Sequence, residues 1–381
     1  MKFVKADMLY DGKGVQKDVF VGFQDSAIKY VGKKKPEGEM IGEGIVTPAF
    51  IDPHSHIGLD RAGEPYLESE ANDKLAPMMP LGRAIDGVYM DDSAFTESVE
   101  NNVLYSVVLP GSGNIMGGMG CLIRNFGKNI KESYIKDIGV KMALGYNPRS
   151  TTDWKGERPT TRMGVSAIIR SKFLAAKKTK VMVDSGKKSI DEVDPETEFL
   201  ISILNGSVKI MCHVHKEDDA LFLMSLVDHF GIRPIINHGG DFHTKTIFEE
   251  IKKRDMSLVY GPMDSHPYKV ELKHESWRNV ELLQNSGIRF ALISDHPVIL
   301  QRNLFLTTRH FMRFGATKEQ CISYLTSRPA EILGLTDLGT LEPEKLASFS
   351  LWSGDPFSME SYPKLVIGEG KEHHPPCVHG T

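Results

Sequence analysis

His54 and His56 stand two residues apart, directly after a short apolar run that ends at Ile51. In an extended segment, residues two apart point to the same side, so both imidazoles face one way. Imidazole nitrogens are ligands for Zn²⁺ and similar divalent ions. The pair therefore indicates two ligands of a metal site, although such pairs also occur among ordinary surface and turn histidines.

Three further apolar runs each end in a side chain that can bind a metal: one in His213, the next in His238 and the last in Asp295. Each side chain would lie at the C-terminal end of a strand, where barrel enzymes carry their catalytic groups. If these polar residues had no common function, their positions at successive strand ends would require several coincidences in the same order. His215 competes with His213, which we prefer because it ends its run directly. We predict one divalent ion held by His54, His56, His213, His238 and Asp295.

The middle of the chain, from about residue 45 to residue 334, alternates short β-branched runs with longer helical patterns. A repeated strand-then-helix order implies parallel strands. This many repeats favours a closed, TIM-like (β/α)8 barrel of the α/β class. We expect the eighth strand within residues 150–206, with Lys180–Val183 as the candidate. The other predicted strands are 46–51, 106–109, 139–144, 208–213, 234–238, 257–260 and 289–293, and predicted helices include 164–177, 218–230 and 271–285.

The sequence pattern at both ends of the chain differs from that of the middle. Short alternating runs at 3–9, 18–22 and 28–31 are separated by turn sequences such as Asp-Gly and Pro-Glu-Gly. The same pattern returns at 349–352 and 364–368. We therefore predict a small composite β-sandwich built from residues 1–48 and 336–381, with the barrel formed by residues 49–335.

The bulk composition is that of a soluble globular protein: 381 residues, 40% hydrophobic, 25% charged and a net charge of −4. Lys and Arg are scattered and form no basic stripe, so a nucleic-acid partner is not expected. No apolar run approaches the ~18 residues of a membrane span, and Asp7 interrupts any signal-type segment. The four cysteines form no CxxC pair. We expect a cytoplasmic protein with a small-molecule substrate and no membrane partner, and we leave a homo-oligomer open.

The order His-x-His, His, His, Asp at successive strand ends resembles the amidohydrolase superfamily. Longer strings are similar to the imidazolonepropionase-related amidohydrolases over nearly the whole chain. This resemblance implies a TIM-like barrel with a composite β-sandwich, a divalent metal at the barrel mouth, and hydrolysis of C–N bonds. The strings are Ile45–His54, Pro110–Asn114, Thr161–Gly164, Asp295–Pro297 and Thr326–Gly334.

One position departs from that family pattern. Relatives commonly carry a glutamate where this chain has Tyr146, and a carboxylate there would ligate or bridge metals. A carboxylated lysine, Lys178 or Lys180, would restore a bridge, but nothing in the local sequence marks either one. We therefore expect a single ion, in an arrangement that resembles the deaminase branch. Zinc is the first expectation, and iron, nickel and manganese suit similar ligands.

The resemblance and the residue types together suggest a reaction. The metal would lower the pKa of a bound water to near neutrality. Asp295 would take the proton and later pass it to the leaving nitrogen, while His238 would be a fourth ligand or polarise the scissile carbonyl. We predict hydrolysis of an amide or cyclic amide. A ring aminohydrolase and a catalytically inactive scaffold barrel, which Tyr146 favours, are the alternatives.

Substrate contacts are expected from loops at the barrel mouth. Arg149 and Arg162 would clamp a substrate carboxylate through bidentate hydrogen bonds, although surface arginines of a long loop explain them equally well. The glycine-rich segment 110–118, which includes Asn114, is interpreted as a tight mouth loop that offers groups to the substrate. His296 is interpreted as part of the pocket wall.

Overall fold

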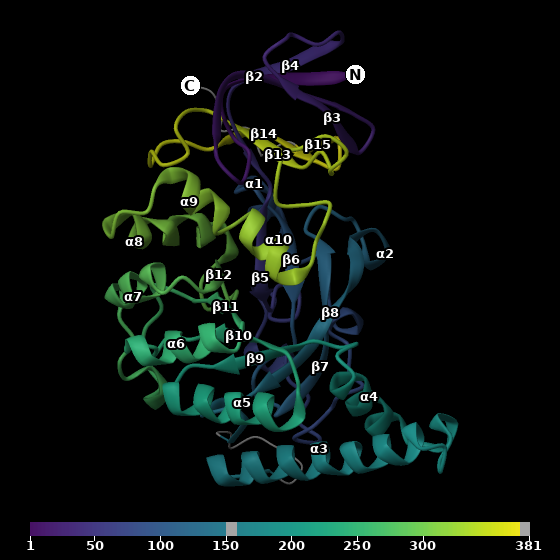
Figure 1. The fold of residues 1–381 in the computed structure, drawn as a ribbon. Coiled ribbons are helices and arrows are strands. Elements are labelled where there is room, and N and C mark those ends of the chain that lie inside the picture. The colour runs from purple at the N-terminus through teal and green to yellow at the C-terminus, as the bar shows by residue number, and fades with distance from the viewer. Residues whose placement is uncertain (150–157, 374–381) are drawn as a thin grey trace.

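The computed structural model describes residues 1–149 and 158–373, which form two β-sheets. Figure 1 shows the larger sheet flanked by helices, and the smaller sheet, made of strands from both ends of the chain, beyond one end of it. The predicted architecture, an α/β barrel with a composite β-domain from both termini, is confirmed.

The larger sheet is a barrel of eight strands in the order β12-β11-β10-β9-β8-β7-β6-β5. Two backbone hydrogen bonds join the ends of its two edge strands: Asp295 N donates to His54 O at 3.1 Å, and His56 N donates to His296 O at 2.8 Å. The first and last strands therefore meet where the predicted ligands lie. The strands are β5 (Phe50–Ser55), β6 (Val103–Val108), β7 (Met116–Arg124), β8 (Tyr134–Ala143), β9 (Ile210–Val214), β10 (Pro234–His238), β11 (Ser257–Tyr260) and β12 (Arg289–Leu292).

The eighth strand is β7, which runs antiparallel to both of its neighbours, whereas the other paired strands of the barrel are parallel. Segment 110–118, predicted as a loop, therefore reaches into the barrel at Met116. The predicted strand Lys180–Val183 is wrong, because these residues belong to α3 (Arg162–Asp184). The buried side chains of α3 recur at three- and four-residue intervals from Val165 to Ala176. This helical period outweighs the short β-branched run.

Helices pack on the outside of the barrel (Figure 1). The predicted helices 164–177 and 218–230 are present, but helix 271–285 is largely wrong. α7 begins only at Val280, and an irregular loop precedes it with the 3-10 turns η5 (Val270–Leu272) and η6 (Trp277–Asn279). Besides α3, the described α-helices are α1 (Ser93–Glu100), α2 (Ile130–Ser133), α4 (Pro195–Leu204), α5 (Glu217–Phe230), α6 (Lys245–Lys253), α7 (Val280–Asn285), α8 (Thr308–Arg313), α9 (Lys318–Ser323) and α10 (Ser327–Leu333).

The smaller sheet has the strand order β15-β14-β13-β4-β1-β2-β3. It has its own core, in which the rings of Phe23 and Phe349 pack edge to face at 5.6 Å. β4 ends at Pro48 and β5 begins at Phe50, so this sheet leads directly into the barrel strand that carries His54. Its strands are β1 (Lys2–Tyr10), β2 (Val15–Gln24), β3 (Ala27–Gly32), β4 (Glu39–Pro48), β13 (Phe349–Trp352), β14 (Pro363–Gly368) and β15 (Lys371–His373).

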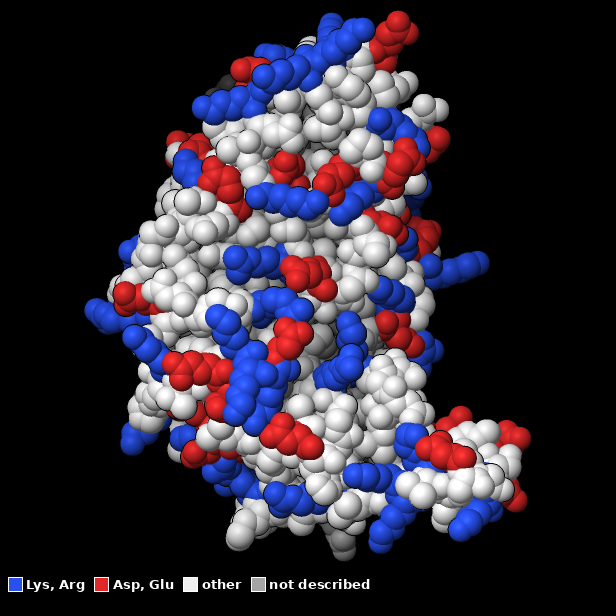
Figure 2. All heavy atoms as spheres, in the orientation of Figure 1, with Lys and Arg blue, Asp and Glu red and all other residues white. Residues whose placement is uncertain are grey.

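The surface in Figure 2 mixes Lys and Arg with Asp and Glu over the whole face shown. Among the described helices, none combines the length and the apolar composition needed to span a bilayer. Cys121, Cys212 and Cys321 are buried free thiols, and Cys377 lies outside the described residues.

Candidate functional site

The structure brings the five predicted ligands together at the C-terminal ends of β5, β9, β10 and β12. The ring centroid of His238 lies 4.6 Å from that of His54 and 4.4 Å from that of His213. Asp295 Oδ1 lies 3.2 Å from Nε2 of His54 and 3.2 Å from Nε2 of His56. Side chains more than 200 positions apart in sequence thus face one small volume.

Two of the imidazoles are oriented by backbone carbonyls. His56 Nδ1 lies 2.7 Å from Leu109 O, and His238 Nδ1 lies 3.0 Å from Gly261 O. Because a carbonyl can only accept, each Nδ1 carries the proton, and the lone pair is left on Nε2. A metal-binding histidine is commonly held in this way by its second nitrogen.

His54 is held by a side-chain amide instead. Its Nδ1 lies 2.8 Å from the amide of Asn237, whose oxygen has no partner in the described structure. Rotation of this amide by 180° places its oxygen against Nδ1–H, since the two amide orientations have nearly the same shape. His54 Nε2 is then free to bind a metal like the other two.

Several imidazole nitrogens of the site are buried without a hydrogen-bond partner among residues 1–149 and 158–373. They are Nδ1 and Nε2 of His213, Nε2 of His238 and Nδ1 of His215. An unpaired buried polar atom costs about 1–3 kcal/mol, so four in one cluster call for a ligand. A divalent ion with imidazole ligands satisfies such atoms directly, and the residues present therefore fit a metal.

The electrostatics of the site favour the metal-binding form of these histidines. Burial, with a contribution from the charge of Lys141, lowers the pKa of His54 to about 3. Burial also lowers the pKa of His215 to about 4 and holds the pKa of His213 and His238 well below the usual value. The imidazoles are therefore neutral at neutral pH, as metal binding requires.

His215 joins the site rather than replacing His213. Its ring stacks on that of His238 at 4.7 Å and meets that of His213 edge to face at 4.7 Å. Two triplets of ligand atoms, each within 4.8 Å of one another, share His238: one adds His54 and Asp295, the other His213 and His215. We call His54, His56, His213, His215, His238 and Asp295 the central cluster.

Asp295 is positioned by a buried network beneath it. Asp52 accepts hydrogen bonds from Ser294 N at 3.2 Å, from Ser294 Oγ and from Gln301 Nε2 at 2.7 Å. Burial raises the pKa of Asp52 to about 6. The backbone of Asp295 is left-handed, with a φ of 52°, and that of His238 has a φ of 82°. Such backbones are uncommon outside glycine, and surrounding contacts must hold them in place.

Lys141, on β8, is a site residue that the sequence analysis missed. Its side chain is fully buried, and Nζ lies 3.2 Å from His54 Nε2. Burial lowers the pKa of Lys141 to about 8, although Asp295 acts in the opposite direction. A lysine inside the apolar run 139–144 was the available signal, because a charge is rarely buried without a function.

The lysines proposed from the sequence for a metal bridge lie elsewhere. Lys178 and Lys180 are on α3, where Lys178 is exposed and Lys180 pairs with Asp184 at 2.5 Å. In the structure, Lys141 contacts one of these imidazoles, His54, and the charge of Lys269 acts on His213 and His215.

A second missed residue, Glu271, brings a carboxylate to Tyr146. Glu271 lies in η5, in the loop after β11, and is 2% exposed. Its Oε2 accepts a hydrogen bond from Tyr146 N at 2.9 Å, and its Oε1 lies 3.5 Å from His213 Nε2. A carboxylate from a distant loop thus lies beside the position where the chain lacks a glutamate. The mistaken helix over 271–285 concealed this contact.

The two arginines predicted to clamp a substrate carboxylate differ in their surroundings. Arg162 donates from Nε to Asp219 Oδ1 at 2.7 Å, so its guanidinium already binds a carboxylate of the protein. The guanidinium of Arg149 lies 5.5 Å from the ring centroid of Tyr146, and its Nε is buried without a partner in the described structure. Arg149 is therefore the better placed of the two for a ligand.

Asn114 and His296 are both buried but have different contacts. Asn114 Nδ2 donates to Asp73 O and Ala76 O, both at 2.9 Å, so it holds the mouth loop in place. His296 is 3% exposed, and its Nδ1 accepts a hydrogen bond from Gln301 N at 3.2 Å.

A cavity of about 370 Å³ adjoins the central cluster, with His56 and His296 in its wall. Apolar side chains, including Pro65, Tyr66 and Val298, make up much of the remaining wall. Charged side chains also line the cavity, namely Asp60, Arg61, Glu64, Glu68 and Glu97. A concave pocket that combines apolar surface with polar groups is typical of small-molecule sites.

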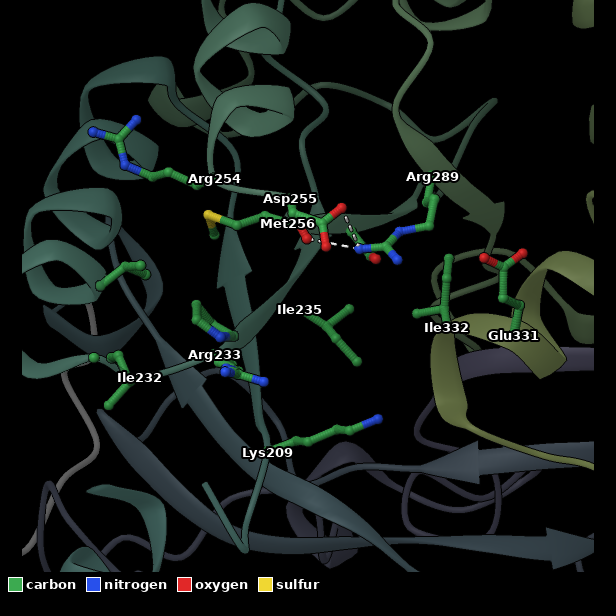
Figure 3. Close-up of a pocket in the computed structure, with 14 residues that line it drawn as sticks. Lys209, Ile232, Arg233, Ile235, Arg254, Asp255, Met256, Arg289, Glu331 and Ile332 are labelled. Carbon is green, nitrogen blue, oxygen red and sulfur yellow. Dashed lines mark hydrogen bonds and ion pairs between the residues drawn. The ribbon is translucent and has the colours of Figure 1, made fainter. Parts of the chain in front are cut away.

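A larger hollow of about 580 Å³ lies at the opposite end of the barrel (Figure 3). Lys209 and Arg233 precede the neighbouring strands β9 and β10, and Arg289 begins β12. Arg289 pairs with Asp255 at 2.9 Å. Its lining includes no histidine. Because barrel enzymes carry their chemistry at the C-terminal strand ends, we place the functional site at the central cluster.

Comparisons with known proteins identify the family and the fold of the chain. The Amidohydrolase family profile matches residues 192–372. The crystal structure of an amidohydrolase from Thermotoga maritima MSB8 is 30% identical, covers 98% of this chain and 99% of that chain, and superposes with a TM-score of 0.89. A prolidase complexed with N-methylphosphonate-L-proline shares the fold at 12% identity, with coverage of 98% and 99% and a TM-score of 0.62.

Amidohydrolase tasK from Hapsidospora irregularis is 25% identical over 386 residues. The match covers 90% of this chain, and the chain spans only 38% of the length of that relative.

Proposed function

Because the chain belongs to the amidohydrolase family, we propose that it hydrolyses an amide or cyclic amide C–N bond of a small molecule with the help of a divalent metal. The observation that carries this proposal is the group of buried, neutral imidazoles whose nitrogens lack hydrogen-bond partners in the described structure. The adjoining cavity, with its mainly apolar wall, supports a small organic substrate.

Asp295 is the proposed proton shuttle. Its side chain is 13% exposed and reaches the mouth, while its Oδ1 lies among the nitrogens of His54 and His56. Water adds to the carbonyl carbon, Asp295 holds the proton that water loses, and the same proton passes to the nitrogen as the C–N bond breaks. Asp52 acts through Ser294 to keep this carboxylate in place.

The proposed ligands are His54, His56, His213, His238 and Asp295. A divalent ion bound there supplies a Lewis acid that polarises a carbonyl and lowers the pKa of water. Zinc suits this imidazole-rich set, and iron, nickel and manganese are bound by similar ones.

The two overlapping ligand triplets and Lys141 favour a second ion position, in contrast to the single ion expected from the sequence. A neutral Lys141 amine can add CO₂ and release a proton, and the resulting carbamate would provide the bridge that we had sought at Lys178 or Lys180. His238 has a single free lone pair, on Nε2, so it would bind at only one of the two positions.

A product assay tests the reaction and separates it from its alternatives. Purified protein, with its metal content measured, is incubated with linear amides, cyclic amides and amino-substituted rings. We expect a new carboxylate without free ammonia from a secondary or cyclic amide. Ammonia released from a ring would instead support the aminohydrolase alternative. A metal-loaded protein that turns over none of these classes would support the scaffold alternative. A cytoplasmic location and membership of the imidazolonepropionase-related group stay predictions.

A further inference from the structure

A second group of metal-binding side chains lies outside the central cluster. Asp241 and His243 follow β10, and His274 lies in the loop between η5 and η6. One ligand atom from each lies within 4.8 Å of the other two. The two imidazole rings lie 4.2 Å apart at an interplanar angle of 31°. We call these three residues the rim cluster.

The hydrogen bonds of the rim cluster leave a nitrogen available on each imidazole. His243 Nδ1 lies 2.7 Å from the backbone oxygen of Asp241 and therefore donates to it. His274 Nδ1 lies 3.3 Å from Asp241 Oδ2. When Nδ1 donates to a carbonyl or a carboxylate, the lone pair of Nε2 is free for a metal. Both histidines are thus in the orientation that metal ligands adopt.

The charge of Asp241 is incompletely balanced. The residue is 1% exposed, and its carboxylate accepts a hydrogen bond from His274 N at 2.5 Å. Within residues 1–149 and 158–373, its only ion-pair contact is His274. Glu217 Oε1 lies 3.6 Å from His243 Nδ1 and adds further negative charge. A buried carboxylate is costly without a compensating cation.

We propose that Asp241, His243 and His274 bind a divalent transition-metal ion of the zinc class, separate from the central cluster. Two imidazoles and a carboxylate form a ligand set that zinc accepts, with water completing the coordination. The side chains of His243 and His274 are 35% and 43% exposed, so the ion exchanges with solvent. It would join the end of β10 to the loop that carries Glu271.

Zinc binding to the full-length protein tests this site. The protein, loaded at the central cluster, is titrated with Zn²⁺, and the bound zinc per chain is compared between wild type and His243→Ala. The imidazole of His243 is 35% exposed and contacts Asp241, Glu217 and His274. It lies after the end of β10, so its removal is expected to leave the strands of the barrel intact. We expect the variant to bind about one zinc fewer per chain, or to bind it at least about tenfold more weakly. His274→Ala is expected to behave in the same way.

His229→Ala is the matched control, because it removes another exposed histidine from the end of α5 and should leave the zinc count unchanged. Anomalous scattering at the zinc edge provides a second measurement and should give a peak between His243 and His274. The proposal is overturned if wild type and His243→Ala bind the same amount of zinc with the same affinity. Zinc seen at the rim only at millimolar concentration would overturn it as well. Neither outcome bears on the central cluster, whose loading is measured separately.

Discussion

The central cluster and the rim cluster use the same residue types, yet they differ in burial. His238 ends β10, and Asp241 follows it three residues later, so one short segment serves both. The central imidazoles of His54, His213 and His238 are between 0% and 2% exposed. The side chains of His243 and His274 in the rim cluster are 35% and 43% exposed.

This difference in burial separates two kinds of chemistry. Desolvation keeps the central imidazoles neutral and shields their nitrogens from water. A ligand that binds these nitrogens therefore gains the full free energy of the interaction. The rim imidazoles can be hydrated when no metal is present, and their affinity for an ion depends on geometry and on the carboxylate of Asp241. The central cluster therefore suits catalysis with a resident ion, while the rim suits an exchangeable one.

The largest expected effect comes from removing the charge of the central carboxylate. Asp295→Asn keeps the shape of the side chain but cannot accept a proton. We expect turnover on an identified amide substrate to fall about 100- to 10,000-fold, with the metal retained at the central cluster. Steady-state kinetics and metal analysis are measured together. Asp337→Asn, at an exposed position, is the control and should match wild type. Full activity in Asp295→Asn would falsify the proton shuttle.

Metal removal distinguishes the two clusters in one experiment. A mild chelator should take zinc from wild type in a fast phase from the rim and a slow phase from the centre, because the buried ion is released only when the surrounding structure opens. We expect His243→Ala to lack the fast phase and His213→Ala to lack the slow one. The released zinc is followed with a colorimetric indicator. A single phase of zinc release from wild type would mean that the two clusters release zinc at the same rate, contrary to what their burial implies.

Sequence alone predicts those residues of the two clusters that are marked by their neighbours along the chain. His54, His213, His238 and Asp295 each end an apolar run, so a few neighbouring residues mark them. Five strands of the smaller sheet and seven of the barrel strands also follow from local patterns of this kind, whereas β4 and β15 of the smaller sheet were not predicted. β7 does not, because its glycine-rich start resembles a loop and its antiparallel direction breaks the repeated strand-then-helix order.

Residues that reach a site through irregular backbone leave no such mark. Glu271 approaches His213 from a loop whose path depends on the packing of the whole barrel mouth. His274 meets Asp241 in the same way, although 33 residues separate them. Lys141 is different, because its strand was predicted and only its role was missed. A charged residue inside a buried strand deserves consideration as a site residue in its own right.

Lys141 supplies a buried cation that the rim cluster lacks, and its removal should stabilise the metal-free protein. The pKa of Lys141 is lowered from 10.5 to about 8, so its charge is less favourable in the folded protein than in the unfolded chain. This cost is complete below pH 8. Between about pH 8 and 10.5 the unfolded chain binds more protons, so stability rises with pH.

We expect Lys141→Met to raise the free energy of unfolding of the metal-free protein at pH 7 by about 1–3 kcal/mol and to weaken metal binding at the centre. Urea unfolding at pH 7 and pH 9.5 measures the first effect, and the gain over wild type should shrink at the higher pH. Lys178→Met, at an exposed position on α3, should change neither property. A destabilised Lys141→Met protein would mean that the attraction to Asp295 exceeds the cost of burial.

The last prediction concerns two carboxylates that lie beside Gly145. A Cβ added to Gly145 would lie 2.7 Å from Glu271 Oε2 and 3.0 Å from Asp219 Oδ2, and the φ of Gly145 is +83°. Gly206 has a φ of +76° with nothing within 4 Å of an added Cβ. Gly206→Ala should therefore cost only the left-handed backbone, about 1–2 kcal/mol. Gly145→Ala should cost about 1–3 kcal/mol more, because Glu271 must move.

Urea unfolding of the two alanine variants isolates that difference, since the backbone penalty is nearly the same in both. Glu271 belongs to the loop that also carries His274, so its displacement should weaken zinc binding at the rim in Gly145→Ala and leave it unchanged in Gly206→Ala. Equal losses of stability in the two variants would show that Glu271 is not held against Gly145. In that case the loop after β11 would adjust freely, and the central and rim clusters would respond to metals independently.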